Sequence, residues 1–102
     1  MADVAIPSSG GEAVVVGKFT GNGRDSQTIT LGFTPSAVLV ISNYGEMYYE
    51  AVMYGGVAVQ GSPCKFRKQN AVEIVTGGFQ VTYSGDNRTN AVDEIRHYIA
   101  FR

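Results

Sequence analysis

Polar and apolar residues alternate along most of this chain with a period of two, the pattern of a β-strand with one buried face. In the clearest segment, residues 26–33, the larger side chains fall on every second position: Gln27, Ile29, Leu31 and Phe33. Residues 79–83 repeat the pattern, and the two glycines at 77–78 predict a hairpin turn from the alternating segment 72–74. Helical periodicity is almost absent, so the sequence predicts an all-β protein.

The predicted strands are short and are bounded by Gly, Asn, Asp or Pro. We expect them at residues 14–19, 26–33, 37–42, 48–54, 57–60, 72–74, 79–83 and 95–101. A set of about eight short strands is typical of an antiparallel β-sandwich of jelly-roll type, which here forms a single domain over residues 13–102. Residues 1–12, which include Pro7 and the run SSGG, predict a flexible N-terminal arm. The run GNGRD at 21–25 predicts a hairpin turn rather than a phosphate loop, because no helix follows it.

Charged residues are scarce in this chain. They make up 17% of it, against about a quarter in an ordinary soluble domain. Sparse charge with ordinary hydrophobicity is typical of a subunit whose surface is partly covered by other copies, and a small all-β monomer is the alternative. Residues 37–42, AVLVIS, are apolar on both faces. We therefore expect them to form either a central strand or a strand covered by another subunit.

The only histidine lies in the last predicted strand, residues 95–101. Alternation places His97 on the face that carries the aliphatic and aromatic side chains, and Arg96 on the other face. A metal site would need further ligands, and a catalytic base would need a nucleophile and a carboxylate, none of which the sequence locates. We interpret His97 as a neutral core residue that is hydrogen-bonded across the sheet, and we predict no metal or other cofactor.

Charge and hydropathy also limit the partners of the protein. The formal net charge is −1 and the basic residues are scattered except for KFRK at 65–68, so we predict no nucleic-acid partner and interpret KFRK as a solvated strand end. No run approaches the roughly 20 apolar residues of a membrane span, and the first residues lack a signal-peptide pattern, so we expect synthesis in the cytoplasm.

Cys64, the sole cysteine, is interpreted as a partly buried packing residue. Residues 84–94 fit no calcium loop and are interpreted as a solvated loop.

The best candidates for ligand binding are the tyrosines and glutamates between residues 44 and 54. A tyrosine ring offers a flat apolar face and a polar tip, which suits a sugar or a protein partner. The predicted patch consists of Tyr44, Glu46, Tyr49 and Glu50. The alternative is that this segment is structural. In that alternative, Tyr48 and Tyr54 belong to the core, while Tyr49 and Met53 cover a subunit interface.

Two carboxylates in this patch raise the alternative of an enzyme. Glycoside hydrolysis uses a pair of carboxylates on opposite sides of the scissile bond, and Glu46 and Glu50 are two carboxylates near aromatic residues, although such pairs are common by chance. A small sandwich is expected to offer no deep cleft for such a reaction. We therefore predict that the protein is not an enzyme.

The order of several segments resembles a known protein family. The segments are GKFTGNGRDSQTITLGFTPSAVLVIS, GGVAV, NAVEIVTGGFQVTYS, an Asn-containing loop and HYIAFR, and together they span residues 17–102. The most specific pieces are TITLGFTPSAV at 28–38 and HYIAF at 97–101. They resemble a C-terminal β-sandwich domain of bacteriophage and prophage virion proteins, such as tail-fibre and tail-appendage chains.

The resemblance implies a β-sandwich that works by binding, commonly as a trimer, in adsorption to a host surface or in virion architecture. We therefore expect a non-enzymatic phage or prophage structural protein located in the virion after synthesis in the bacterial cytoplasm. Its expected partners are further copies of itself and other virion proteins, and a host-surface glycan is a candidate ligand. Both a tail component and a capsid decoration remain open. The alternative is a free-standing carbohydrate-binding or interaction module that is not tied to a virion.

Overall fold

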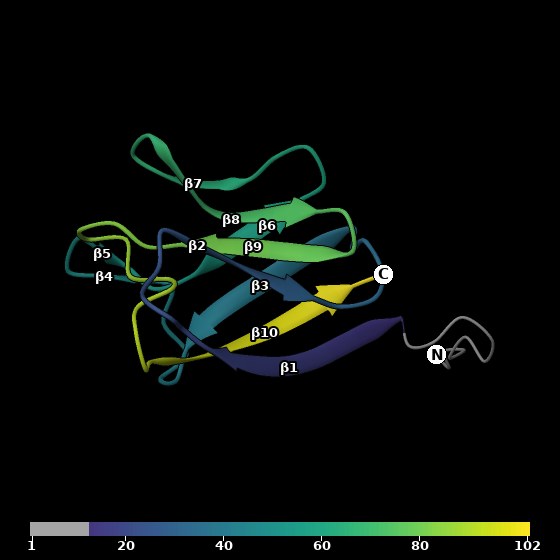
Figure 1. Cartoon of the computed structure of the whole chain (residues 1–102), viewed down its shortest axis with the longest axis horizontal. Coiled ribbons are helices and arrows are strands. Elements are labelled where there is room, and N and C mark those ends of the chain that lie inside the picture. The colour runs from purple at the N-terminus through teal and green to yellow at the C-terminus, as the bar shows by residue number, and fades with distance from the viewer. Residues whose placement is uncertain (1–12) are drawn as a thin grey trace.

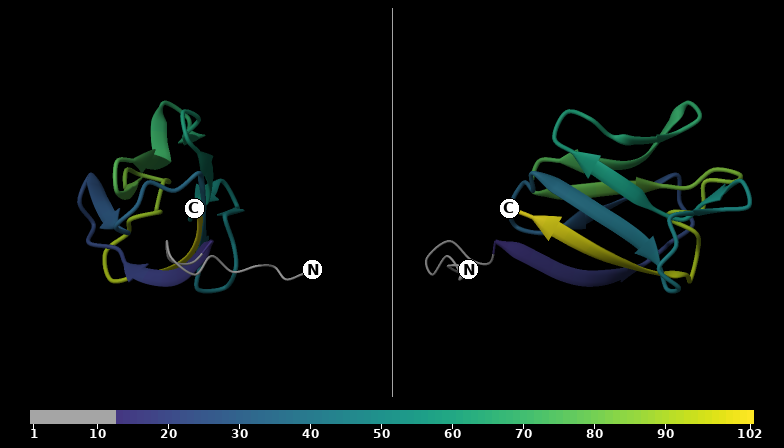
Figure 2. Two further views of the ribbon diagram at one scale, coloured as in Figure 1. Left: turned by 90° about the vertical axis from the view of Figure 1, so that its right-hand side faces the viewer. Right: turned by 180° about the vertical axis from the view of Figure 1, so that it is seen from behind.

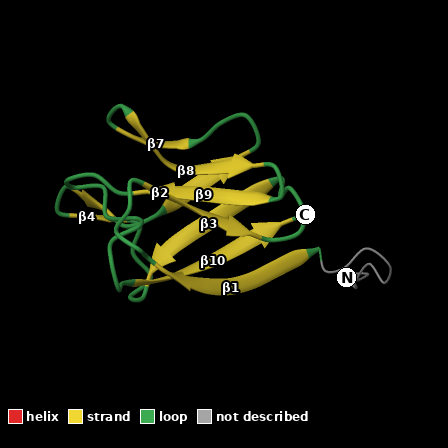
Figure 3. Cartoon of the chain, in the orientation of Figure 1, coloured by secondary structure: helices red, strands yellow, loops and turns green. Residues whose placement is uncertain are grey.

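The computed structural model describes residues 13–102, and these residues form ten β-strands and no helix (Figures 1 and 3). The strands are β1 (Val14–Thr20), β2 (Ser26–Thr30), β3 (Ala37–Ser42), β4 (Tyr48–Tyr49), β5 (Val52–Met53), β6 (Gly56–Val59), β7 (Cys64–Phe66), β8 (Gln69–Val75), β9 (Gly78–Thr82) and β10 (Ile95–Phe101). The predicted arm at 1–12 lies outside the described residues. No helix in the described part is long and apolar enough to cross a membrane.

Eight of the strands form two antiparallel sheets of four, which confirms the predicted β-sandwich. One sheet has the order β1-β10-β3-β6 and the other has the order β2-β9-β8-β7. The chain crosses between the sheets after β1 and again after β2, and β10 returns to lie between β1 and β3. Strands β7, β8 and β9 form a meander, with the predicted hairpin turn at Gly77 between β8 and β9.

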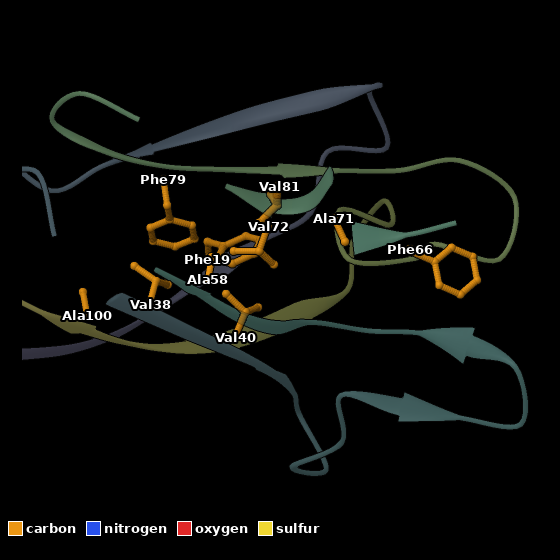
Figure 4. Packing of buried hydrophobic residues seen from close by; sticks show 10 residues of the cluster. All are labelled: Phe19, Val38, Val40, Ala58, Phe66, Ala71, Val72, Phe79, Val81 and Ala100. Atoms are coloured by element: carbon orange, nitrogen blue, oxygen red, sulfur yellow. The ribbon is translucent and has the colours of Figure 1, made fainter. Parts of the chain in front are cut away.

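The core lies between the inner faces of the two sheets (Figures 2 and 4). Phe79 of β9 is fully buried, and its ring packs edge-on against Phe19 of β1 at 6.1 Å and Tyr98 of β10 at 5.2 Å between centroids. Such pairs add about 0.5–1.5 kcal/mol to the stabilisation from burial itself. Because Phe79 belongs to one sheet and its two partners to the other, these contacts hold the layers together.

The structure shows residues 37–42 to be a central strand, β3, flanked by β10 and β6. Its inner face is buried through Val38 and Val40, while Leu39 and Ile41 on its outer face are only partly buried. The apolar character of both faces therefore has two different explanations. One face fills the core, and the other belongs to the outer surface of the sheet.

The interpretation of His97 as a core residue is wrong. The register of β10 places Ala100 opposite Val15 and Val38 on the inner face, so Arg96 also points inward and His97 points outward. His97 does form a hydrogen bond toward the neighbouring strand, since its Nε2 lies 2.8 Å from Oδ1 of Asn43, the residue that follows β3. Alternation alone fixed which side chains share a face, but the neighbouring strands decide which face is buried.

Two local predictions also fail, and one strand was missed. Residues 48–54 form a two-stranded hairpin instead of one strand, because Glu50 and Ala51 at its tip adopt positive φ angles of 50° and 65°. Strand β7 was not predicted. Residues 21–25 connect two different sheets and so are not a hairpin turn. Gly21 fits there because a Cβ atom would overlap the carbonyl oxygen of Ala91.

Candidate functional site

One end of the sandwich is built from the β4–β5 hairpin, the β7–β8 turn and residues 83–94, and we call it the loop end (Figure 1). The C-terminus lies at the opposite end (Figure 1). Residues 84–94 are not the solvated loop that the sequence suggested. Several of their side chains are fully buried and hydrogen-bonded, which gives the loop end a fixed shape.

Asn87 anchors the first half of this loop. Its Nδ2 donates to Oε1 of Gln69 at 2.7 Å and to Oγ1 of Thr82 at 2.8 Å, and its Oδ1 accepts from the hydroxyl of Thr89 at 2.8 Å. Asn87 is completely buried, so each of these bonds replaces water that the amide has lost. The turn before it is closed by two backbone hydrogen bonds between Ser84 and Asn87.

Asn90 anchors the second half of the loop to the β1–β2 connection. Its Oδ1 accepts from the amide of Asn22 at 3.2 Å and from Nε2 of Gln27 at 3.1 Å. Its Nδ2 donates to Oδ1 of Asn22 at 2.8 Å and to the carbonyl of Arg24 at 3.1 Å. All four hydrogen bonds of this buried amide are formed with residues more than 60 positions earlier in the sequence.

Arg96 reaches the buried base of the loop with its charge compensated. Its Nη2 lies 2.7 Å from Oε1 of Glu94 and donates to the carbonyl of Arg88 at 2.7 Å. Glu94 also pairs with Arg88 at 2.9 Å. Partial burial acts to raise the pKa of Glu94, but the hydrogen bonds and charges of the two guanidinium groups together hold the pKa below its ordinary value. The same pairing raises the pKa of Arg88.

The four predicted ligand-binding residues lie in the segment that connects β3 to β5. Tyr44 is 89% exposed in the turn after β3, and Tyr49 and Glu50 are exposed at the β4–β5 hairpin. Glu46 is half-buried, and its backbone amide donates to Oγ of Ser42 at 3.0 Å. No hydrogen bond or ion pair joins any two of the four among the described residues. The structure therefore places them along one exposed segment without assembling them into a common site.

The structural alternative for the tyrosines is also only partly right. Tyr48 is 59% exposed rather than buried, and its ring lies beside Phe66 with 6.4 Å between centroids. Met53 packs against the core instead of an interface. Backbone bonds from the amide of Met53 to the carbonyl of Asp86 and from the amide of Arg88 to the carbonyl of Met53 tie this hairpin to the 84–94 loop. Tyr48 and Tyr49 of the β4–β5 hairpin are therefore held next to the loop.

A pocket of about 360 Å³ opens at the loop end between the β7–β8 turn and the turn at 84–87. Its walls are Phe66, Arg67, Lys68, Gln69, Ser84, Gly85 and Asp86. Nη2 of Arg67 and Oδ2 of Asp86 lie 3.5 Å apart and join the two walls, while the Arg67 guanidinium lies 4.8 Å from the Phe66 ring centroid. The sequence reasoning missed this pocket. The KFRK cluster supplied a signal, but nothing in the sequence indicated that it meets residues 84–86.

The backbone at Arg67 is also unusual. Arg67 has a φ of 57° and occupies the first position of the two-residue turn between Phe66 and Gln69. This position normally takes glycine, because other residues reach positive φ only at a steric cost. The turn therefore holds a long cationic side chain where local geometry favours glycine.

The outer face of the β1-β10-β3-β6 sheet is the second surface with a distinct character. Two rows of apolar side chains run across all four strands: Val14, Phe101, Ala37 and Val59, and then Val16, Ile99, Leu39 and Val57. Val16 is 72% exposed, and Val57 and Val59 are about half exposed. The third row holds Lys18, the only formally charged side chain on these outward positions, beside His97 and Ile41.

The described residues contain little that suggests reaction chemistry. No group of three or more His, Cys, Asp or Glu residues among residues 13–102 is placed to hold a metal ion. Cys64 is partly buried, as expected, and burial raises the pKa of its thiol, which disfavours the reactive thiolate at neutral pH. Comparison of the chain with protein-family models, with curated proteins and with solved structures gave no match.

Proposed function

We propose that this protein is a non-enzymatic structural subunit of a phage or prophage virion. It assembles as a homotrimer through the outer face of the β1-β10-β3-β6 sheet and presents its loop end to a host surface or to another virion protein. The observation that carries the proposal is the pair of apolar rows across that face. The largest apolar patch on a protein surface is often functional and marks a site of interaction.

The dimensions of the face support this use. Four strands spaced about 4.8 Å apart span about 19 Å. β1 and β10 are seven residues long, which is about 24 Å at about 3.4 Å per residue, whereas β3 has six residues and β6 has four, so the face is at most roughly 19 by 24 Å. This is comparable with the largest apolar patch of an ordinary monomer, about 300–600 Å², which is often functional. The small fraction of charged residues in the chain agrees with a surface that is partly covered by other subunits.

The virion assignment is supported by the segments that carry the family resemblance. Only the C-terminal ends of the two most specific pieces are neighbours: Ala37 and Val38 of β3 pair with Phe101 and Ala100 of β10. The amide of Ser36 donates to the carbonyl of Phe101 at 2.7 Å, and Pro35 beside it is fully buried. The first residues of the 28–38 piece belong to β2 in the other sheet.

Particle composition tests the virion assignment. Prophage induction in the source bacterium, followed by density-gradient separation of the lysate, is expected to place peptides of this chain in the particle fractions by mass spectrometry. A major particle protein from the same induction serves as the positive control. A chain found only in the soluble fractions, as a monomer with saturable sugar affinity, would favour the free-standing carbohydrate-binding module instead.

A further inference from the structure

We propose that the pocket between the β7–β8 turn and residues 84–86 binds an acidic sugar, meaning a saccharide unit that carries both hydroxyl groups and a carboxylate. The proposal rests on the proposed contact with a host surface and names the ligand class for that contact. The pocket volume of about 360 Å³ falls at the lower end of the range for small-molecule sites, roughly 300–1,000 Å³. It therefore has room for a saccharide unit rather than a large ligand.

The charges in the pocket favour a ligand with one anionic group. Arg67 and Lys68 contribute two cations against the single carboxylate of Asp86. The Arg67–Asp86 pair is long at 3.5 Å, and both side chains are more than half exposed. Exposed pairs of this kind are weakly held, so a ligand carboxylate can compete with Asp86 for the Arg67 guanidinium.

The neutral groups and Asp86 favour hydroxyl groups on the same ligand. Oε1 of Gln69 accepts from Asn87, which fixes the amide and leaves its Nε2 as a donor without a hydrogen-bond partner among the described residues. Ser84 adds a hydroxyl group, and Asp86 can accept hydrogen bonds from ligand hydroxyls. A phosphomonoester carries up to two negative charges, more than the single net positive charge of Arg67, Lys68 and Asp86, whereas a sugar with one carboxylate matches that charge and offers hydroxyl groups to the neutral side chains.

An exposed aromatic side chain lies at the margin of the pocket. Phe66 contributes to the wall but is itself largely buried, and Tyr48, which is exposed, lies beside it. Aromatic rings next to polar side chains suit the apolar face of a sugar ring. This places the β4–β5 hairpin beside the pocket, so part of the tyrosine cluster can contribute to the same contact.

Titration of the isotope-labelled protein by NMR tests the proposal with two matched probes. A hyaluronan tetrasaccharide carries glucuronate, and tetra-N-acetylchitotetraose is a neutral tetrasaccharide of the same length. The glucuronate probe is expected to give saturable shifts of the amide signals of residues 67–69 and 84–86, and the neutral probe is expected to bind at least about tenfold more weakly. Added salt is expected to weaken the binding of the glucuronate probe, because it screens the charges.

Charge-neutral variants locate the site. Arg67→Gln and Lys68→Gln are each expected to lower the affinity for the glucuronate probe about tenfold, because each removes a charge-assisted hydrogen bond. Lys65→Gln is the matched control, since Lys65 is exposed on β7 but does not line the pocket, and it is expected to change affinity by less than about twofold. All three are surface changes, and unchanged dispersion of the other signals verifies folding.

Three outcomes would overturn the proposal. The first is an absence of pocket shifts at about 10 mM probe, which means an affinity weaker than millimolar. The second is equal binding of the two probes, and the third is an equal loss of affinity in Lys65→Gln. The titration uses the isolated protein, so its result is independent of whether the chain is found in virus particles.

Discussion

Replacing Asn90 with alanine should destabilise the protein far more than its place in a loop suggests. The side chain is fully buried and forms four hydrogen bonds, which hold the 84–94 loop against the β1–β2 connection. At a net contribution of about 0.5–1.5 kcal/mol for each bond, the simple sum is about 4 kcal/mol. The partners Asn22, Arg24 and Gln27 are partly exposed and can bind water instead, so we expect a loss of about 2–3 kcal/mol.

Asn43→Ala is the matched control for this change. Asn43 is exposed and forms a side-chain bond only to His97, so its removal is expected to cost less than about 1 kcal/mol. Urea unfolding at one fixed protein concentration measures both variants, because the stability of an oligomer depends on concentration. If the two variants differ by less than about 0.5 kcal/mol at equal m-values, the loop is not anchored as described.

Two further predictions concern the same end of the molecule. The pKa of Glu94 is lower in the folded protein than its ordinary value, so its pairing stabilises the protein above the unfolded pKa, and this stabilisation is lost as the pH falls through the folded pKa. Glu94→Gln should therefore reduce stability at neutral pH and flatten the fall of stability on acidification, as measured by urea unfolding at a series of pH values. Gly21→Ala should cost about 2 kcal/mol or more in thermal or urea unfolding, because the new Cβ overlaps the carbonyl of Ala91. Gly45→Ala, where the space is open but φ is 82°, should cost only about 1 kcal/mol, and the reverse order would contradict the close packing at Gly21.

The strands were the most predictable part of this protein. Residues 37–42 and 95–101 form strands within the predicted bounds, because alternation and β-branched side chains act over a few neighbouring residues. The buried face of β10 was predicted wrongly for a reason that lies outside that segment. Arg96 can point inward only because Glu94 and the carbonyl of Arg88 receive its guanidinium group, and no local pattern indicates this.

The candidate sites were less predictable because they depend on contacts between distant segments. In the predicted patch, Tyr44, Tyr49 and Glu50 are exposed and Glu46 is half-buried, but the four side chains do not converge. The pocket instead lies between the turn at Arg67 and the turn at Asp86. The buried amide of Asn87 holds the two turns together, because it donates a hydrogen bond to Gln69. A buried asparagine in a polar loop has the same sequence signature as a solvated one, so its role becomes visible only in the fold.

In the proposed homotrimer, further copies of this chain cover the outer face of the β1-β10-β3-β6 sheet. Light scattering of the purified protein over a range of concentrations tests this claim, with two variants alongside. Val16→Lys places a charge on the apolar rows, and Val92→Lys places the same charge at an exposed valine on the loop end. We predict three times the 10.9 kDa mass of one chain for the unmodified protein and for Val92→Lys, and a shift toward the monomer for Val16→Lys. An unmodified protein that stays at the mass of one chain at every concentration would contradict the claim.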